Sequence, residues 1–234
     1  MAGAAASSHT GNGNADDPPL FGGGHFVPLL YTQQEFDHIF LDGRRVRVFD
    51  HPLEPSEDRI CNQGSAFPDG PQQTCGCCSC ATLINMARGS ADERSVVTYA
   101  LGKGYCKRDG STSPQSWINI LADAGIRATD HTGESLRSLA DKVEEGYGVQ
   151  IGVMTGIYGE KIYGPFVPGV SGGHSLVLES VIRDEKTGEI IEYVVVDSNG
   201  ESSSDAAKRV SPHELEAAFG IMGSPAIVTD DVIW

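Results

Sequence analysis

Apolar residues recur at helical spacing in several stretches of the chain. In each stretch the apolar positions fall three or four residues apart, which is typical of a helix that lays one face on a core. The stretch after Cys75 shows the pattern most clearly, with Cys80, Leu83, Ile84 and Ala87 on one side. The expected helices run from Cys75 to near Gly89, from Ser113 to a stop at Gly125, from Ser135 to Glu145, and from Gln33 to Phe40.

The second half of the chain changes to the two-residue period of strands. A polar run from Asp184 to Gly188 predicts a hairpin between two of them. Ser211 and Pro212 open a further helix, where Glu214 could close a capping box. The expected strands are Arg44–Phe49, Val149–Val153, Ser175–Ile182, Ile190–Asp197 and Ala226–Thr229. Because helices mostly precede an antiparallel sheet, the pattern predicts an α+β fold.

Composition and charge narrow the classes of function. The 234 residues are 39% hydrophobic and 21% charged, as in globular proteins. Seventeen basic against thirty-two acidic residues give a net charge of −15, which repels nucleic acid and anionic lipid. No apolar run approaches the roughly 20 residues that span a bilayer. These counts argue against a nucleic-acid-binding protein and against an integral membrane protein.

The composition of the first 24 residues predicts a disordered tail. They contain no Lys or Arg and no apolar stretch, so they do not resemble a secretory signal peptide. We therefore expect a cytoplasmic protein, or one that is secreted by a non-classical route. Residues 25–70 form an irregular N-terminal extension, in which Gly64 to Pro71 reads as a loop.

Cysteine usage is unusual. Four of the six cysteines, Cys75, Cys77, Cys78 and Cys80, fall within six residues, and the others are Cys61 and Cys106. Disulfide scaffolds spread their cysteines along short chains, and structural zinc sites take two separated pairs, so neither pattern is met. In an oxidising compartment, one or two disulfides that involve Cys61 or Cys106 are compatible with the sequence.

Three chemically suited residues fall where the expected elements would bring them together. A cysteine at a loop-to-helix junction gains thiolate character from the partial positive charge of the helix N-terminus. His174 follows Gly172 and Gly173 at a strand start, and Asp197 ends the next strand of the hairpin. An imidazole beside a thiol, oriented by an acid, is the arrangement of nucleophilic catalysis. The spacing permits a Cys–His–Asp triad.

Several segments resemble, in chain order, motifs of the papain-like cysteine peptidases, in particular their C39-like branch. The resemblance covers roughly Gln72 to the C-terminus. The similar segments are Cys75–Asn85 (nucleophile helix), Gly110–Pro114 (before a helix), Glu145–Val153 (first central strand), Gly173–Leu178 (histidine strand), Val195–Gly200 (aspartate turn) and Val210–Leu215 (closing helix).

The resemblance implies a papain-like fold, with the nucleophile on a central helix packed against a C-terminal antiparallel sheet. Residues 71–234 would be the catalytic domain. Cys75 would be the nucleophile, His174 the general base and Asp197 the residue that orients His174, with Asn199 as the alternative to Asp197. No metal or organic cofactor is implied.

The resemblance leaves the register of the nucleophile open. The oxyanion glutamine of the family usually stands six residues before the nucleophile, where Asp69 precedes Cys75; Gln72 and Gln73 lie nearer. In the stricter papain register Gln72 stands six residues before Cys78, and Cys75 would be a disulfide cysteine. On a helical wheel, Cys77 and Cys80 fall on the apolar side and are expected to be buried, while Cys75 and Cys78 face away from it. We prefer Cys75, with Cys78 as the alternative nucleophile.

These observations predict a thiol-dependent hydrolase that acts on amide bonds of a protein or peptide, as a peptidase or a deamidase. The alternatives are an acyltransferase or transglutaminase on the same fold, or a non-enzymatic module held by metal or disulfides. Stand-alone members of the family without a Sec signal include bacterial effectors and toxins, often with an inhibitory partner protein. A further hypothesis is that Pro52 to Pro71 occupies the cleft as a propeptide.

Overall fold

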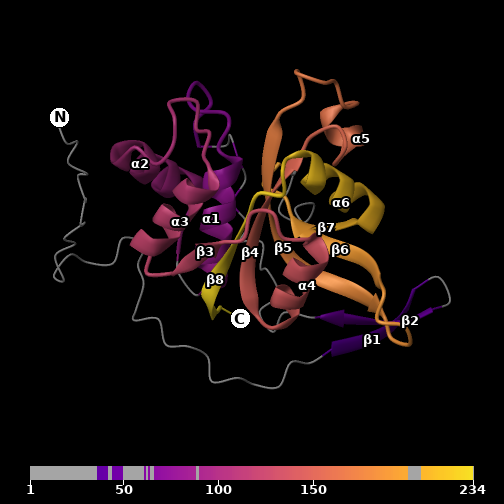
Figure 1. Ribbon diagram of the computed structural model, residues 1–234. Coiled ribbons are helices and arrows are strands. Elements are labelled where there is room, and N and C mark those ends of the chain that lie inside the picture. Colours follow the sequence, from indigo (N-terminus) through magenta and orange to yellow (C-terminus); the bar gives the residue numbers. More distant parts are fainter. Residues whose placement is uncertain are drawn as a thin grey trace, which may run out of the picture.

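The computed structural model describes residues 36–41, 44–49, 61, 63, 66–87, 90–199 and 207–233. Within them, eight strands form one antiparallel sheet, and six helices pack around it (Figure 1). The strands are β1 (Phe36–Leu41), β2 (Arg44–Phe49), β3 (Ala128–Asp130), β4 (Tyr147–Met154), β5 (Gly173–Asp184), β6 (Ile190–Val196), β7 (Ala207–Val210) and β8 (Ala226–Val232). The helices are α1 (Cys75–Met86), α2 (Glu93–Lys103), α3 (Pro114–Asp123), α4 (Leu136–Glu144), α5 (Glu160–Tyr163) and α6 (Pro212–Ile221).

Strand β5 is the centre of the sheet. It is 12 residues long and pairs with β4, β6 and β2, and these pairings connect the two ends of the sheet. One path through the sheet runs β1-β2-β5-β4-β8-β3, and β6 and β7 extend from β5. Nine consecutive residues of β5, from His174 to Ile182, are buried. The strand therefore provides a rigid platform for any side chain near its start.

Helices cover both faces of the sheet. Helices α1, α2 and α3 lie together on one side, and α4 and α6 lie on the other (Figure 1). On β4, Gln150 reaches the α1 side, where its amide donates to the carbonyl of Gly76. Helix α1 packs against β5 and β4 and also against α2 and α3, so all of its residues after Cys75 are buried. Its first residue, which is partly exposed, is therefore where the helix meets the surface.

The structure confirms the α+β class and most of the expected elements. The helix starts predicted at Ser113 and Ser135 are confirmed, and each serine caps its helix by accepting a hydrogen bond from a backbone N–H of the first turn. Asp184 to Gly188 forms the turn between β5 and β6. Ser211 caps α6, but the Glu214 carboxylate accepts from the backbone N–H of Gly159 instead of completing a capping box.

The helix expected over Gln33–Phe40 is wrong, because the described part of that stretch belongs to strand β1. Its apolar repeat is too short to distinguish a helix from a strand. Strand β2 follows directly and pairs with β1 residue by residue, from Phe36 opposite Phe49 to Leu41 opposite Arg44. The hairpin continues into the main sheet through β2 and β5, so two strands precede the helices. The predicted tail, residues 1–24, lies outside the described residues.

The sequence pattern also missed helix α2. Its start is marked by a capping box, in which Asp92 and Ser95 each bond the other's backbone N–H. In the described part of the chain, none of the helices has the length and apolar character needed to cross a bilayer.

Candidate active site

The first turn of α1 presents Cys75 at the edge of the core. Thr74 precedes it, and the Thr74 hydroxyl donates to the buried carboxylate of Glu93 on α2 at 2.5 Å. Gly76 packs so closely against the start of α3 that a Cβ there would clash with Thr112 Oγ1 and with Trp117 Nε1. These two contacts fix the position of the cysteine between α2 and α3.

His174 and Asp197 come together through the β5–β6 hairpin. His174 is the second residue of β5, and Asp197 follows β6 directly. Because Val177 pairs with Val196, the start of β5 lies beside the end of β6. His174 Nε2 lies 2.8 Å from Asp197 Oδ1, and both side chains are buried. This contact leaves the other ring nitrogen for Cys75, to which His174 is hydrogen-bonded.

The three groups favour a thiolate beside an imidazolium. Burial raises the pKa of Cys75, but the hydrogen bond and charge of His174 and the N–H groups of Ser175 and Gly76 outweigh it, so the pKa lies below its ordinary value. Burial lowers the pKa of His174, but Asp197 and Cys75 outweigh it and raise the pKa to about 9. The ion pair is therefore the favoured state near neutral pH.

Asp197 has several hydrogen-bond partners besides His174. Besides His174, its carboxylate accepts hydrogen bonds from Tyr158 Oη at 2.7 Å, from Lys208 Nζ at 2.8 Å and from the backbone N–H of Asn199 at 2.9 Å. Tyr163 Oη lies 3.2 Å from both Asp197 Oδ2 and His174 Nε2. Burial raises the pKa of Asp197, but the hydrogen bond and charge of His174, with the hydrogen bonds from Lys208 and the Asn199 N–H, hold it well below its usual range.

The sequence reasoning missed Tyr158, Tyr163 and Lys208. The two tyrosines lie in the segment between β4 and β5, which shows neither helical nor strand periodicity. Lys208 lies on β7, a four-residue strand whose pattern is too short to read. Asn199, the alternative to Asp197, contributes its N–H to the carboxylate, and its side chain is hydrogen-bonded to Tyr163. It is therefore Asp197 that contacts the histidine ring.

The other cysteines of the cluster are buried away from His174. Cys77, Cys78 and Cys80 are each 0% exposed. Burial raises the pKa of Cys78, and its contacts with Cys61 raise it further. A hydrogen bond with Cys106 and burial both raise the pKa of Cys77. Cys80 points at Gln150 and the carbonyl of Trp117, and burial raises its pKa despite the Gln150 bond. Of the two candidate nucleophiles, the structure brings Cys75 to His174 and Cys78 to Cys61.

The two glutamines lie just before α1, and their hydrogen bonds go to backbone carbonyls of neighbouring loops. Gln72 Nε2 donates to the carbonyls of Phe67 at 2.8 Å and Gly70 at 3.3 Å, which uses both amide hydrogens. Gln73 is exposed, and its backbone N–H donates to the backbone carbonyl of Asp109.

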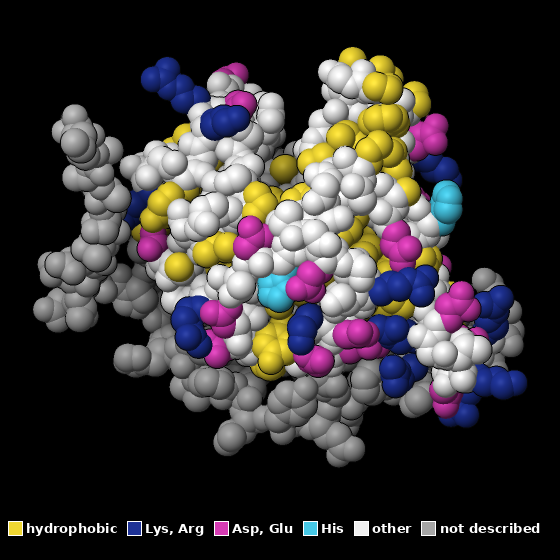
Figure 2. All heavy atoms as spheres, in the orientation of Figure 1, with side chains coloured by type: hydrophobic (Ala, Val, Ile, Leu, Met, Phe, Trp, Pro, Cys, Tyr) yellow, Lys and Arg dark blue, Asp and Glu magenta, His cyan; other side chains and the backbone are white. Residues whose placement is uncertain are grey.

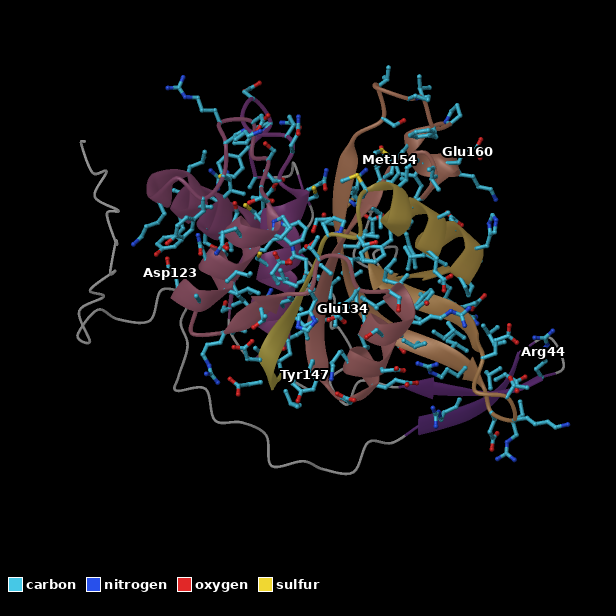
Figure 3. All side chains as sticks on the ribbon, viewed as in Figure 1. Arg44, Asp123, Glu134, Tyr147, Met154 and Glu160 are labelled. Atoms are coloured by element: carbon cyan, nitrogen blue, oxygen red, sulfur yellow. The ribbon has the colours of Figure 1, made fainter. Side chains whose placement is uncertain are left out.

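The site opens at one end of the sheet. Val153 and Met154 of β4 pair with His174 and Gly173. Met154 and Glu160 lie at this end of the molecule, and Tyr147 lies at the other end of β4 (Figure 3). The surface is hollowed there, between the helices of the α1 side and the β4–β5 segment (Figure 2). Among the described residues, large exposed apolar side chains include Ile162, Val167 and Val170 of that segment.

Two further features of the described residues bear on ligands. They contain no group of three or more His, Cys, Asp or Glu that could hold a metal ion. A cavity of about 700 Å³ lies between α5, β7 and α6, and Tyr158 and Lys208 form part of its lining. It is separate from Cys75, which does not line it.

Comparison with known proteins identifies the fold. Neither a family model nor a curated protein matches the sequence. Among solved structures, the chain is similar to a protein from Bacillus anthracis that bears the provisional name C39-like peptidase. The TM-score is 0.50 at 17% sequence identity, over 74% of this chain and 94% of that one. At this identity the likeness shows a shared papain-like, C39-like α+β fold.

Proposed function

We propose that the protein is a thiol-dependent hydrolase of amide bonds, a cysteine peptidase or deamidase that uses Cys75, His174 and Asp197. One observation carries the proposal: a partly exposed cysteine at a helix start is hydrogen-bonded to a histidine whose other ring nitrogen lies 2.8 Å from a buried aspartate. A partly exposed thiolate of lowered pKa beside an imidazolium is the form in which cysteine attacks a carbonyl.

In the proposed reaction the Cys75 thiolate attacks the amide carbon, and the imidazolium of His174 gives its proton to the leaving amine. Neutral His174 then takes a proton from water as the water oxygen attacks the thioester carbon, and the C–S bond breaks to release the acid and restore the ion pair. Asp197 holds the ring in the orientation that both steps need. The steps require no metal or organic cofactor.

Backbone N–H groups at the start of α1 are available to stabilise the oxyanion, because the first N–H groups of a helix lack partners within it. Gln72 is the side-chain donor that the sequence suggests, with Gln73 as the alternative. For Gln72 to take this role, its amide must first release the carbonyls of Phe67 and Gly70.

The proposed substrate is a protein or peptide. The exposed apolar side chains of Val167 and Val170 favour a partner with apolar residues, because they lie on the segment that leads into β5 and His174. The same triad supports acyl transfer when an amine replaces water as the acceptor. Hydrolysis is the default proposal because water needs no second binding site.

The test uses a mixed library of unlabelled peptides and mass spectrometry of the products, which separates backbone cleavage from side-chain deamidation. Products should form with the native chain, fall by a factor of about 10³ or more with Cys75→Ala, and persist with the control Cys80→Ala on the same helix. Unchanged product formation with Cys75→Ala would refute the proposal. Loss of the fold on chelation, in a native chain that forms no products, would favour the non-enzymatic, metal-held alternative.

A further inference from the structure

Five of the six cysteines take no part in the proposed chemistry, and the fold brings four of them together in two pairs. All six are free thiols within the described residues. Cys61 Sγ lies 2.8 Å from Cys78 Sγ, and both side chains are buried. Unbonded carbon atoms pack at about 3.5–4.0 Å, so these sulfurs are in closer contact than ordinary packing requires. They need to approach by less than about 1 Å to reach the 2.05 Å of a disulfide.

The second pair joins Cys77 to Cys106. The two side chains are hydrogen-bonded, and the bond lowers the pKa of Cys106 while it raises that of Cys77. Cys106 is partly exposed, on the segment between α2 and α3, whereas Cys77 is fully buried in α1. Cys106 is therefore the thiol of this pair that can meet a reagent from solution.

The pairs leave two cysteines without a thiol partner. Cys75 faces His174, and Cys80 faces the amide oxygen of Gln150. Cys77 and Cys78 are neighbours in the sequence, yet successive helix positions point about 100° apart, so each reaches a different segment of the chain. Exchange of partners between the two pairs would require these segments to leave α1.

We propose that Cys61–Cys78 and Cys77–Cys106 are two disulfide sites, which form when the protein meets a low-molecular-weight disulfide such as oxidised glutathione. A protein thiolate attacks one sulfur of the reagent and expels the first glutathione thiolate. The second cysteine thiolate then attacks the protein sulfur of this mixed disulfide and expels the second. Each protein pair loses two electrons and two protons, and one oxidised glutathione becomes two glutathione thiols.

Both crosslinks would hold the first turn of α1, where Cys75 lies. The Cys61 crosslink would fix Cys61 beside α1. Nearby in sequence, the backbone N–H of Gln63 donates to the carbonyl of Ser198, the residue after Asp197, at 2.9 Å. The Cys106 crosslink would fasten the α2–α3 segment, which carries Thr112 against Gly76. The two crosslinks would therefore stabilise the surroundings of Cys75, and neither of them uses its thiol.

The experiment equilibrates the full chain in a buffer of oxidised and reduced glutathione, alkylates the remaining thiols at low pH and maps the crosslinked peptides by mass spectrometry. We expect the crosslinks Cys61–Cys78 and Cys77–Cys106 and an intact mass, read before alkylation, about 4 Da below that of the reduced chain. We expect the unfolding midpoint to rise by roughly 5–10 °C over the reduced form. None of these readouts depends on hydrolytic activity.

Single variants assign each crosslink. Cys61→Ser should abolish the first and leave the second, and Cys106→Ser should do the reverse. Cys80→Ala, on the same helix, should leave both intact. If a serine variant fails to fold, the peptide map of the native chain alone decides. Alkylation of all four cysteines after oxidation, or a map dominated by other pairs such as Cys77–Cys78, would overturn the proposal.

Discussion

At the scale of single residues, the site depends on how one carboxylate is shared. Asp197 accepts from the ring of His174, from Tyr158 and from Lys208, so its charge is divided between the imidazolium and a second cation. A cation near Asp197 weakens the pull of the carboxylate on the proton of His174. Lys208 is thus placed to limit how far the pKa of His174 rises.

This placement predicts a pH profile. Activity should rise as pH increases through the lowered pKa of Cys75, and it should fall as pH increases through about 9, where His174 loses the proton needed by the leaving amine. Lys208→Met should move the falling limb to higher pH, by roughly a few tenths to one unit, because the opposing cation is gone. The measurement is kcat/KM against pH for a peptide substrate.

The control for this prediction is Lys142→Met, which removes an exposed lysine of α4 that is paired with Glu145. It should leave both the rising and the falling limb of the pH profile in place. A merely structural role for Lys208 would lower activity at every pH without moving the limb. A limb that shifts to lower pH would contradict the electrostatic argument.

At the scale of elements, the start of α1 is the critical feature. Gly76→Ala would place a methyl group against Thr112 Oγ1 and Trp117 Nε1, which are hydrogen-bonded to each other at 2.7 Å. We expect the free energy of unfolding in urea to fall by about 1–3 kcal/mol, since overpacking forces the helix and α3 apart. Displacement of Cys75 should lower activity further than the stability loss explains.

The matched control is Gly102→Ala on α2, where an added Cβ meets nothing within 4 Å. This change should be neutral or raise stability by about 0.5–1 kcal/mol, because alanine loses less backbone entropy in a helix. Equal effects of the two substitutions would show that helix propensity, and not the contact with α3, decides the result.

Local patterns predicted most of the elements that have a clear period, but they missed helix α2 despite its capping box. Ser113, Ser135 and Ser211 marked three helix starts correctly. The helical wheel separated Cys77 and Cys80 as buried, but it could not separate Cys75 from Cys78. Helix α1 is covered on every side, so no solvent face exists for Cys78 to occupy. Cys78 is buried against Cys61, which lies 17 positions earlier in the chain, and no local period predicts that contact.

For the candidate triad, too, the sequence predicted some of the contacts and missed others. The positions of His174 and Asp197 follow from a hairpin that the polar turn at Asp184 to Gly188 predicts. The donors around Asp197 could not be predicted, because Tyr158 and Lys208 reach it from segments that show no periodicity. Strand β1 was predicted as a helix for the related reason that its pairing with β2 outweighs a weak local repeat.

At the scale of the whole molecule, the sheet joins the N-terminal hairpin to the rest of the fold. Val46 of β2 is fully buried where β2 pairs with β5, and β5 also carries His174. The described β1–β2 hairpin is therefore joined directly to β5, the strand that carries His174 of the site. We expect it to unfold together with the remainder of the domain.

Val46→Ala tests this cooperativity. The change should lower the free energy of unfolding by about 1–3 kcal/mol through lost apolar contacts. Because α3 belongs to the same unit, Trp117 fluorescence, read in a Trp234→Phe background that removes the other of the two tryptophans, should report the same lowered midpoint as circular dichroism. A Trp117 midpoint that stays unchanged while the sheet signal shifts would show that the hairpin unfolds separately.

The central claim is that Cys75 and His174 form a thiolate–imidazolium pair, and the rate of iodoacetamide labelling against pH tests it most directly. Peptide mapping should find Cys75 labelled fastest, with its rate sustained well below the usual thiol pKa of about 8.5. In His174→Ala, burial is no longer offset by the ring, so labelling of Cys75 near pH 6.5 should slow by about 10- to 100-fold. Fast labelling of Cys78 instead, or a Cys75 rate that does not change in His174→Ala, would contradict the account.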